Sequence, residues 1–415
     1  MDHVASALRA RLGTNAGLAT ALLSTLFLSA PSSLRAEVPV GEPQTGASSS
    51  PPGPQDVPDS DFPYEARKIA GPLVLPWSVA FLPDGRMLVT ERPGRLRMIE
   101  GDTLLPEVIT GVPQVLSGGH SGLLDVLVDQ NFPKTHRLFL SYMEGTPEAA
   151  MIRVVRATLD GMSLVDKKVI FASRPAISGV DQIGGRLAFG TDGLIYLTIG
   201  ERDQKERAQD LLDDAGKIVR FRDDGTIPDD NPFVGRSDAL PEIYSYGHRN
   251  PQGLIGNVGE GQLWSIEQGP HGGDELNLIV GGSNYGWPLV TYGINYDGTI
   301  ISDRTSAPGM VDPVYHWVPS VAPASLVSYS GNVMPEDWRG NFLIGTLAGE
   351  CLIRLEMTNG VVTKEDRYLH HTIGRIRDVT VGPDGYLYLL TDGTAASLFR
   401  LEPLSDQVAN RHPLQ

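Results

Sequence analysis

The chain of 415 residues has one cysteine, Cys351, and fewer basic than acidic side chains. A single cysteine excludes an intramolecular disulfide and any metal cluster held by several thiolates. Lysine and arginine number 34 against 50 aspartate and glutamate, giving a formal net charge of −16. Such a charge disfavours binding of nucleic acid or anionic lipid through the overall electrostatic field. Cys351 lies in an apolar segment, where we expect it to be part of the core.

The N-terminal region has the composition of an export signal. Arg9 and Arg11 precede an apolar run over residues 16–30, which is shorter than the ~20 residues that a bilayer-spanning helix needs. Small residues follow, so we predict a secretory signal peptide over residues 1–36, with an uncleaved membrane anchor as the alternative. A signal of this kind predicts a periplasmic or secreted protein without stable membrane insertion after processing.

The segments flanking the expected folded region have little apolar content to bury. Residues 37–61 are rich in proline, serine and glycine, which predicts a disordered linker. We expect the folded domain to cover residues 62–405 and to be followed by a flexible tail over 406–415.

A repeated pattern predicts the architecture of the folded region. A turn that usually contains glycine is followed by a short apolar strand at six places: PDGRMLVTE (83–91), HRLFLSY (136–142), TDGLIYLTIG (191–200), GEGQLWSIE (259–267), RGNFLIGT (339–346) and PDGYLYLLTD (383–392). Alternating apolar residues in these strands indicate half-buried β-strands. Groups of strands at a long regular period favour radial repetition.

We therefore predict an all-β fold, a six-bladed β-propeller of four-stranded antiparallel blades. A β-sandwich or two β-barrels are the alternative. The longest gap between repeats separates Gly261 from Gly340, where long loops would lie on one face and offer a ligand site.

Three arginines stand out in so acidic a chain. Arg249 lies in YGHRNPQG, and Arg375 and Arg377 lie two residues apart in GRIRDV, so a strand would point both to one face. Guanidinium groups suit bidentate capture of carboxylate or phosphate, which favours a small polyanion as ligand. The alternative is that they form surface salt bridges with Asp378, Asp384 or Asp392.

Hard oxygen donors gather in EQGPHGGDELN (267–277) and the following NYGWP. Asp274, Glu275 and the carbonyls of Gly269, Pro270 and Tyr285 form a set that suits Ca²⁺. Loops of this composition without a metal are also common, so the residues alone leave this site open.

Several of these segments occur together in one known family. GLLDV (122–126), GGRL (184–187), IPDDNPF (227–233), GHRNPQG, EQGP, GGDELN, NYGWP and RIRDV occur in the same order as in the soluble sugar dehydrogenases that depend on pyrroloquinoline quinone (PQQ), and the chain resembles these enzymes over nearly all of its folded region. Their fold is a six-bladed propeller.

The resemblance implies PQQ held near the propeller axis, with Ca²⁺ polarising the quinone. The expected reaction oxidises the anomeric hydroxyl of an aldose to a lactone and passes electrons to an external acceptor. Matched positions imply PQQ contacts from Arg249, Asn250, Arg375 and Arg377, and pocket positions at Gln252, Gln268, Tyr296 and Ser320. They also imply calcium ligands from the backbone of Gly269 and Pro270, and a second calcium position at Glu275 and Tyr285.

The chain departs from the family at the catalytic base. The family has a histidine just before the GGRL-like motif, where this chain has Gln182, and it commonly has glutamine ahead of GLLDV, where this chain has His120. Glutamine is not a useful proton acceptor near neutral pH. We therefore expect the two residues to have exchanged roles, with His120 as base, Gln182 positioning the substrate and Asp181 orienting the base. Asp181 acting directly as base is the alternative.

A further departure is Ala348, which replaces a lysine found in relatives, so one cation expected to face the cofactor is missing. Two other functions therefore stay open: a propeller that binds a ligand or a protein without catalysis, and a calcium-dependent lactonase. The lactonase would need a carboxylate-rich metal cage, which we do not find at the starts of the blades.

Overall fold

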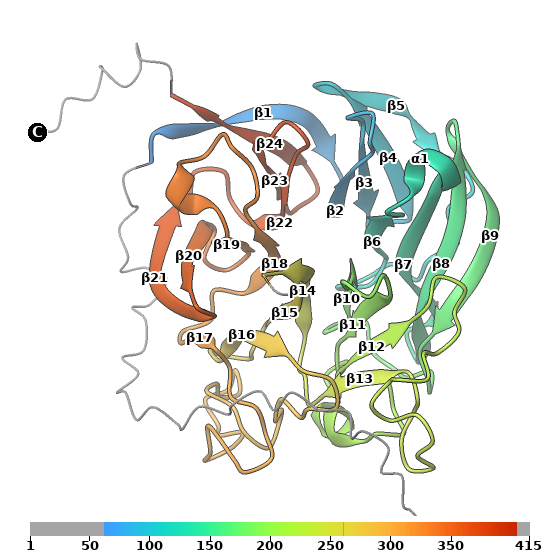
Figure 1. Ribbon diagram of the computed structural model, residues 1–415, viewed down its shortest axis with the longest axis vertical. Helices are drawn as coiled ribbons and strands as arrows, with labels where there is room; N and C mark the ends of the chain where they lie inside the picture. Colours follow the sequence, from blue (N-terminus) through green and yellow to red (C-terminus); the bar gives the residue numbers. More distant parts are fainter. Residues whose placement is uncertain (1–61, 260, 405–415) are drawn as a thin grey trace, which may run out of the picture. The chain divides into compact units, whose positions relative to one another are not determined.

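The computed structural model describes residues 62–404 apart from residue 260, so the predicted signal peptide, linker and tail lie outside the described residues. The described strands form six four-stranded antiparallel sheets. The sheets are arranged around a central axis as the blades of a β-propeller (Figure 1), which confirms the predicted fold.

The first three blades follow one another along the chain. Blade 1 consists of β2 (Pro76–Phe81), β3 (Met87–Glu91), β4 (Arg95–Glu100) and β5 (Thr103–Ile109). Blade 2 consists of β6 (Leu123–Val128), β7 (Arg137–Thr146), β8 (Ala149–Asp160) and β9 (Ser163–Ala172), with the short helix α1 (Phe132–Thr135) before β7. Blade 3 consists of β10 (Gly184–Phe189), β11 (Ile195–Ile199), β12 (Lys217–Phe221) and β13 (Ile243–Tyr246), with a 3₁₀ helix at Lys205–Gln209.

The last three blades continue the same order. Blade 4 consists of β14 (Pro251–Val258), β15 (Gln262–Glu267), β16 (Asp274–Ile279) and β17 (Tyr315–Trp317). Blade 5 consists of β18 (Pro323–Ser328), β19 (Phe342–Thr346), β20 (Leu352–Thr358) and β21 (Val361–Tyr368), with a 3₁₀ helix at Glu336–Trp338. Blade 6 consists of β22 (Ile376–Val381), β23 (Leu387–Thr391), β24 (Ala396–Pro403) and β1 (Tyr64–Leu73).

Blade 6 is closed by the two ends of the described chain. β1 pairs antiparallel with β24, from Tyr64 opposite Pro403 to Leu73 opposite Ala396. The first strand thus covers the edge that the last strand would otherwise expose. The repeat pattern alone did not indicate this closure, because β1 carries no copy of the repeated turn.

Each of the six sequence repeats supplies the second strand of a blade, and its turn connects that strand to the first. In blade 1 the Leu82 N–H donates to the carbonyl of Arg86 at 2.8 Å, and Gly85 has a φ of +88°. The corresponding turn in blade 6 has Gly385 at a φ of +82°. Glycine adopts these angles without the steric cost that other residues incur.

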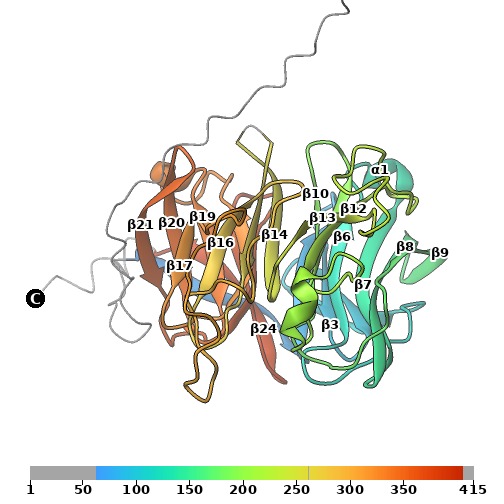
Figure 2. The ribbon, with the colours of Figure 1, turned by 90° about the horizontal axis from the view of Figure 1, so that it is seen from below.

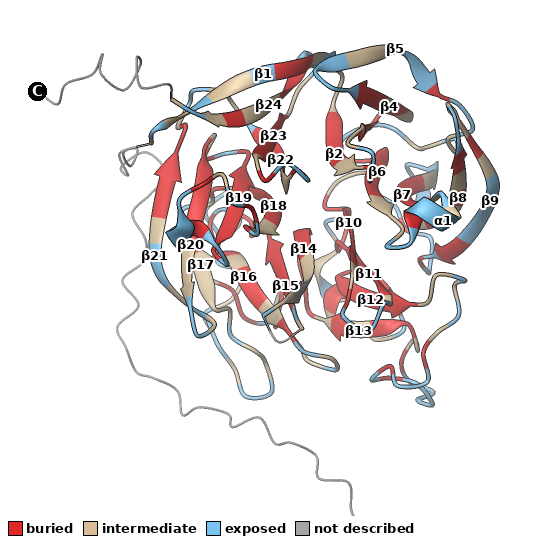
Figure 3. Cartoon of the chain, turned by 45° about the horizontal axis from the view of Figure 1, so that its top comes forward, coloured by how far each residue is buried: buried red, intermediate tan, exposed pale blue. Residues whose placement is uncertain are grey.

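The second strands are more deeply buried than the sequence predicted. Every residue of β3, β11, β19 and β23 is buried, although alternation of buried and exposed residues was expected. The reason is that both faces of a blade pack against neighbouring blades, so even the polar Thr90 and Thr198 are enclosed. Exposed residues gather on outer strands such as β5 and β9 (Figure 3). Cys351, next to β20, is buried.

The first strand of every blade lies innermost (Figure 1). Viewed from the side, the strands run between the two faces of the propeller (Figure 2). The starts of the innermost strands and the ends of the antiparallel second strands therefore meet at one face.

No helix among the described residues is long and apolar enough to span a bilayer.

Candidate active site

A cavity of about 410 Å³ opens where the innermost strands begin. Every blade contributes to its wall. The lining residues at or just before the innermost strands are Trp77, Gly119, His120, Asp181, Ile183, Gly184, Asn250, Gln252, Ala322, Arg375 and Arg377. The cavity thus lies at the axis, as a ligand site of a propeller is expected to.

Four further lining residues occupy one common position of the repeat. Arg92, Gln268, Leu347 and Asp392 each follow the last residue of a second strand directly. Because second strands run antiparallel to innermost strands, this position falls at the same face as the innermost strand starts. Arg92 and Asp392 were not predicted as site residues, and aligning PDGRMLVTER with PDGYLYLLTD would have placed both at the tenth position of the repeat.

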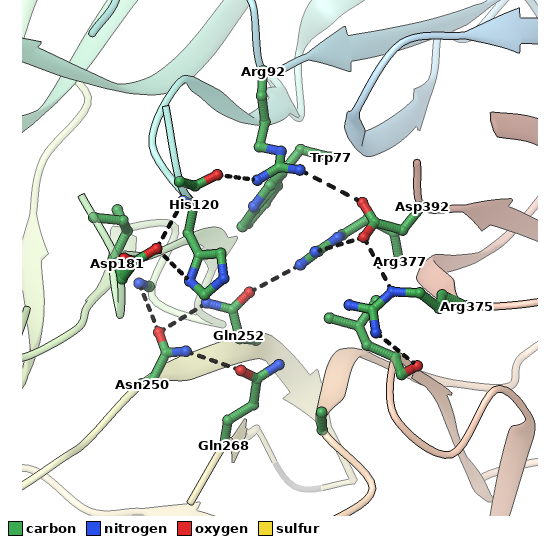
Figure 4. Close-up of a pocket in the computed structure, with 15 residues that line it drawn as sticks. Trp77, Arg92, His120, Asp181, Asn250, Gln252, Gln268, Arg375, Arg377 and Asp392 are labelled. Carbon is green, nitrogen blue, oxygen red and sulfur yellow. Dashed lines mark hydrogen bonds and ion pairs between the residues drawn. The ribbon is translucent and has the colours of Figure 1, made fainter. Parts of the chain in front are cut away.

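His120 and Asp181 lie together on one wall of the cavity (Figure 4). The His120 Nδ1 atom is 3.4 Å from Asp181 Oδ1, and the His120 backbone N–H donates to the same oxygen at 3.2 Å. The His120 side chain is 53% exposed, and the desolvation of its buried part is the largest effect that lowers its pKa; Asp181 opposes this effect, and Arg377 and Arg92 add to it. A histidine with this pKa is neutral at physiological pH and can accept a proton.

The opposite wall carries arginines around one carboxylate (Figure 4). Asp392 Oδ2 is 3.5 Å from Arg377 Nη2 and 3.4 Å from Arg375 Nε, and Asp392 Oδ1 is 3.8 Å from Arg92 Nη2. The three guanidinium groups lower the pKa of Asp392 against the effect of its burial. Three cations around one anion leave an excess of positive charge on this wall.

The positions of Arg375 and Arg377 are compatible with both interpretations, and binding of an anion stays a prediction. The two side chains line the cavity, as an anion site requires, and they also pair with Asp392, as the salt-bridge alternative required. The Arg377–Asp392 pair is buried, with side chains 7% and 11% exposed, whereas the Arg375 side chain is 48% exposed and makes its pair at the cavity opening.

Amide side chains connect the two walls. Asn250 Oδ1 accepts hydrogen bonds from the Gly184 N–H at 3.1 Å and from Gln252 Nε2 at 2.9 Å. Gln252 Oε1 accepts from Arg377 Nη1 at 3.4 Å, and Gln268 Oε1 accepts from Asn250 Nδ2 at 3.1 Å. This network orients polar groups around the cavity before any ligand binds.

Four other predicted residues are not among those that line the cavity. Gln182 is buried, and its Oε1 atom has no hydrogen-bond partner among the described residues. Arg249 is buried and donates from Nη1 to the carbonyls of Gln268 at 2.9 Å and Gly269 at 2.7 Å. Tyr296 is 74% exposed and stacks on His271. Ser320 donates to Asp274 Oδ2 at 2.8 Å.

The loop expected to bind the first calcium ion is held by a buried carboxylate. Asp274 accepts hydrogen bonds from the backbone N–H groups of Gly269 at 2.8 Å, Val321 at 2.7 Å and Ala322 at 2.9 Å. Burial raises the pKa of Asp274 to about 6, although these hydrogen bonds favour its ionised form. Asp274 thus fixes the Gly269–Pro270 backbone next to Ala322, which lines the cavity.

The second predicted calcium position contains two neighbouring acidic side chains. Glu275 lies opposite Glu267 in the ladder between β15 and β16, and Asn277 Nδ2 donates to both, at 3.1 and 3.0 Å. Burial, and then the charge of Glu267, raise the pKa of Glu275 well above its ordinary value. Tyr285 is buried and stacks on His248. The described residues contain no cluster of three or more acidic, histidine or cysteine side chains arranged for a metal.

Comparison with known proteins relates this chain to sugar dehydrogenases. Residues 73–400 match the sequence profile described as Glucose / Sorbosone dehydrogenase. The chain is similar to the aldose sugar dehydrogenase YliI of Escherichia coli (strain K12), with 40% identity over 334 residues, which cover 79% of this chain and 90% of that protein. A solved glucose dehydrogenase structure has 42% identity and a TM-score of 0.79 over 81% of this chain and 99% of its own.

A solved structure with a bound cofactor is also similar. The PQQ-bound form of an aldose sugar dehydrogenase from Streptomyces coelicolor has 28% identity and a TM-score of 0.69, covering 82% of this chain and 97% of that chain. The similarity therefore extends over most of the propeller.

Proposed function

The chain belongs to the glucose/sorbosone dehydrogenase family, and we propose that it oxidises the anomeric hydroxyl of aldose sugars to lactones with PQQ and Ca²⁺. The observation that carries the proposal is the cavity in which a histidine–carboxylate pair faces an arginine-rich wall. An external electron acceptor completes the turnover, and the N-terminal segment favours a periplasmic or secreted location.

The residues of the arginine wall fit a ring with three carboxylates. Arg375 and Arg377 share one carboxylate, Asp392, so their donors are not all satisfied within the protein. The Arg377 Nε atom is buried and lacks a hydrogen-bond partner among the described residues. An anionic ligand would satisfy such a donor and neutralise the excess charge. The volume of about 410 Å³ lies within the range of ligand pockets.

Backbone carbonyls and acidic side chains of residues 267–275 are the candidate ligands for a cation. The carbonyls of Gly269 and Pro270 would supply ligands for a first Ca²⁺, on backbone that Asp274 holds in place, after the Arg249 guanidinium that donates to the Gly269 carbonyl at 2.7 Å turns away from it. The carboxylates of Glu275 and of the neighbouring Glu267 would balance the charge of a second Ca²⁺ ion. When bound, PQQ would supply the quinone that takes up hydride, and Ca²⁺ would draw charge from it.

We assign proton transfer to His120. Its Nδ1 atom faces the Asp181 carboxylate at 3.4 Å, so the neutral tautomer with hydrogen on Nδ1 leaves Nε2 free to accept a proton. Nε2 would take the proton of the anomeric hydroxyl while the anomeric carbon loses hydride, and the ring becomes a lactone. Asp181 orients the imidazole and stabilises the imidazolium that forms. The amides of Asn250 and Gln252 would bind polar ligand groups.

The test is reconstitution of the purified protein with PQQ and Ca²⁺. We expect a difference spectrum on titration with PQQ, and aldose-dependent reduction of a dye. His120→Gln should bind PQQ but lose about 10²–10⁴-fold in kcat. His136→Asn, in the loop after α1 and away from the cavity, is the matched control and should keep full activity. Absence of PQQ binding would instead support a non-catalytic binding propeller, and a fully active His120→Gln protein would refute the assigned base.

A further inference from the structure

Arg92 occupies the gap between the base and the arginine wall (Figure 4). One guanidinium nitrogen, Nη1, donates to the carbonyl of Gly119 at 2.6 Å. The other, Nη2, is 3.8 Å from Asp392 Oδ1. The side chain is 8% exposed, and its Nε atom has no hydrogen-bond partner among the described residues. The Arg92 side chain thus connects the loop that carries His120 to Asp392, the carboxylate that pairs with the arginines of the opposite wall.

The loop before β6 is built to allow this approach. A Cβ atom at Gly122 would lie 2.2 Å from the Arg92 carbonyl oxygen, and one at Gly119 would lie 2.7 Å from Asp181 Oδ1. Side chains at these two positions would push the loop away from Arg92 and from Asp181. Both glycines also have positive φ angles, +152° and +53°, which favour glycine. The loop is therefore shaped by the contacts on both sides of His120.

Arg92 is also one of the charged groups that affect the protonation of His120. The groups that act on the imidazole are Asp181, Arg377, Arg92 and Asp203. Two are cations of the cavity wall, and both disfavour a protonated His120. An anion on this wall would offset their effect.

We propose that Arg92 is a positioning residue that joins the anion-binding wall to the base: it holds the His120 loop through Gly119 and pairs with the arginine wall through Asp392. The inference rests on the proposed function for its catalytic consequence. The effect of the Arg92 charge on His120 and the positioning of the His120 loop can be tested separately. Lysine at this position keeps the positive charge but loses the planar guanidinium group that contacts two partners at once.

The first experiment measures the titration of His120 by NMR in the protein without cofactor or sugar. Arg92→Met should raise the pKa of His120, because a neighbouring cation is removed, and Arg92→Lys should leave it close to the wild-type value. The matched control is Arg95→Met, which removes an arginine of the same blade that pairs with Glu91 outside the cavity. It should not shift the titration. An unchanged His120 titration in Arg92→Met would overturn the charge coupling.

The second experiment measures kinetics of the reconstituted protein. Arg92→Met and Arg92→Lys should both lose about 10²-fold in kcat with little change in KM for the sugar, because a displaced base affects the transition state more than substrate binding. Arg95→Met should keep the wild-type kcat. Wild-type kcat in both Arg92 variants would overturn the positioning role.

The two experiments also separate this inference from the proposed function. The NMR titration needs no PQQ, so it tests Arg92 whether or not the protein is an enzyme. Failure of the wild-type protein to bind PQQ would refute the proposed function alone. A folding defect in Arg92→Met would be recognised by near-UV circular dichroism. Arg92→Lys, which conserves the charge, would then test the positioning role through kcat, and a wild-type kcat in this variant would overturn it.

Discussion

The guanidinium group of Arg186 lies over the indole ring of Trp77, with its central carbon 4.2 Å from the ring centroid. Arg186 comes from β10 and Trp77 from β2, so the contact joins blades 3 and 1 across the axis. The same guanidinium contacts the other four innermost strands through Asp125, Asp378 and the carbonyls of Gln252 and Ala324. One side chain of the GGRL motif therefore touches all five other blades next to the cavity-lining Trp77.

Arg186→Met should destabilise the protein by about 3–5 kcal/mol, because two buried carboxylates, Asp125 and Asp378, would lose their counter-ion. Burial already raises the pKa of Asp378 to about 6, with Arg186 opposing the rise. The decrease in the free energy of unfolding should therefore be larger at pH 7, where the Asp378 carboxyl is ionised, than at pH 5.

Urea unfolding at the two pH values measures this effect. Arg220→Met is the matched control, since Arg220 is equally buried but its partners Asp192 and Asp230 are 30% and 73% exposed and can be solvated. An equal loss in both variants would contradict the argument.

The pH dependence of turnover should follow His120. Because the pKa of His120 is lowered, mainly by desolvation, the acid limb of kcat/KM should lie below pH 6.5. Asp181→Asn removes a charge that favours the imidazolium, so the limb should move to still lower pH while kcat falls. The measurement is kcat/KM between pH 4.5 and 8, and a shift to higher pH would count against His120 as base. Asp297→Asn, in an exposed loop, serves as the control.

Asp274→Asn should destabilise the loop that presents Gly269 by about 2–4 kcal/mol, because both carboxyl oxygens accept backbone hydrogen bonds and the amide nitrogen of asparagine can accept none. The pKa of Asp274 is raised to about 6 in the folded state, above its unfolded value. Its protonation therefore favours folding below about pH 4, and this contribution is lost as the pH rises through 6.

The cost of Asp274→Asn should accordingly be larger at pH 4.5 than at pH 7 in chemical unfolding. Asp238→Asn, at an exposed ion pair with Arg236, should show a small and nearly constant cost. A cost that increases with pH would refute this account.

Calcium should stabilise the protein through Glu275. A cation would relieve the repulsion between Glu275 and Glu267 that, together with burial, raises the pKa of Glu275. We expect saturating Ca²⁺ to raise the melting temperature of the wild type, and Glu275→Gln to lose most of this increase. Glu356→Gln, at a half-exposed position in β20, is the control and should respond like the wild type. An undiminished calcium response in Glu275→Gln would place the ion elsewhere.

Removal of β1 should open the propeller. Deletion of residues 62–73 would expose the edge of β24 and remove the buried side chains of Ile69 and Leu73. We expect a lower melting temperature and aggregation in size-exclusion chromatography, because an uncovered strand edge pairs with other chains. A monomeric variant with the wild-type melting temperature would show that closure by β1 is dispensable.

Much of the fold could be predicted from the sequence, because each repeat consists of residues that are close together along the chain. A glycine turn followed by an apolar strand needs only neighbouring residues to form, and six copies specify six blades. The closure by β1 was not readable, because its pairing with β24 joins residues more than 300 positions apart. Burial of whole second strands was also missed, since it depends on blades packing against both faces.

By itself the sequence determined the number of blades and the residue types available for chemistry, and it predicted an exchange of roles between His120 and Gln182. Only the tertiary structure decided which of these residues share the cavity. It brings His120 to Asp181 and Arg377 to Asp392, and it adds Arg92, while Arg249 and Tyr296 are not among the lining residues. The physical reason is that the cavity collects residues from strand ends of all six blades, and their distances follow from the closure of the ring rather than from spacing along the chain.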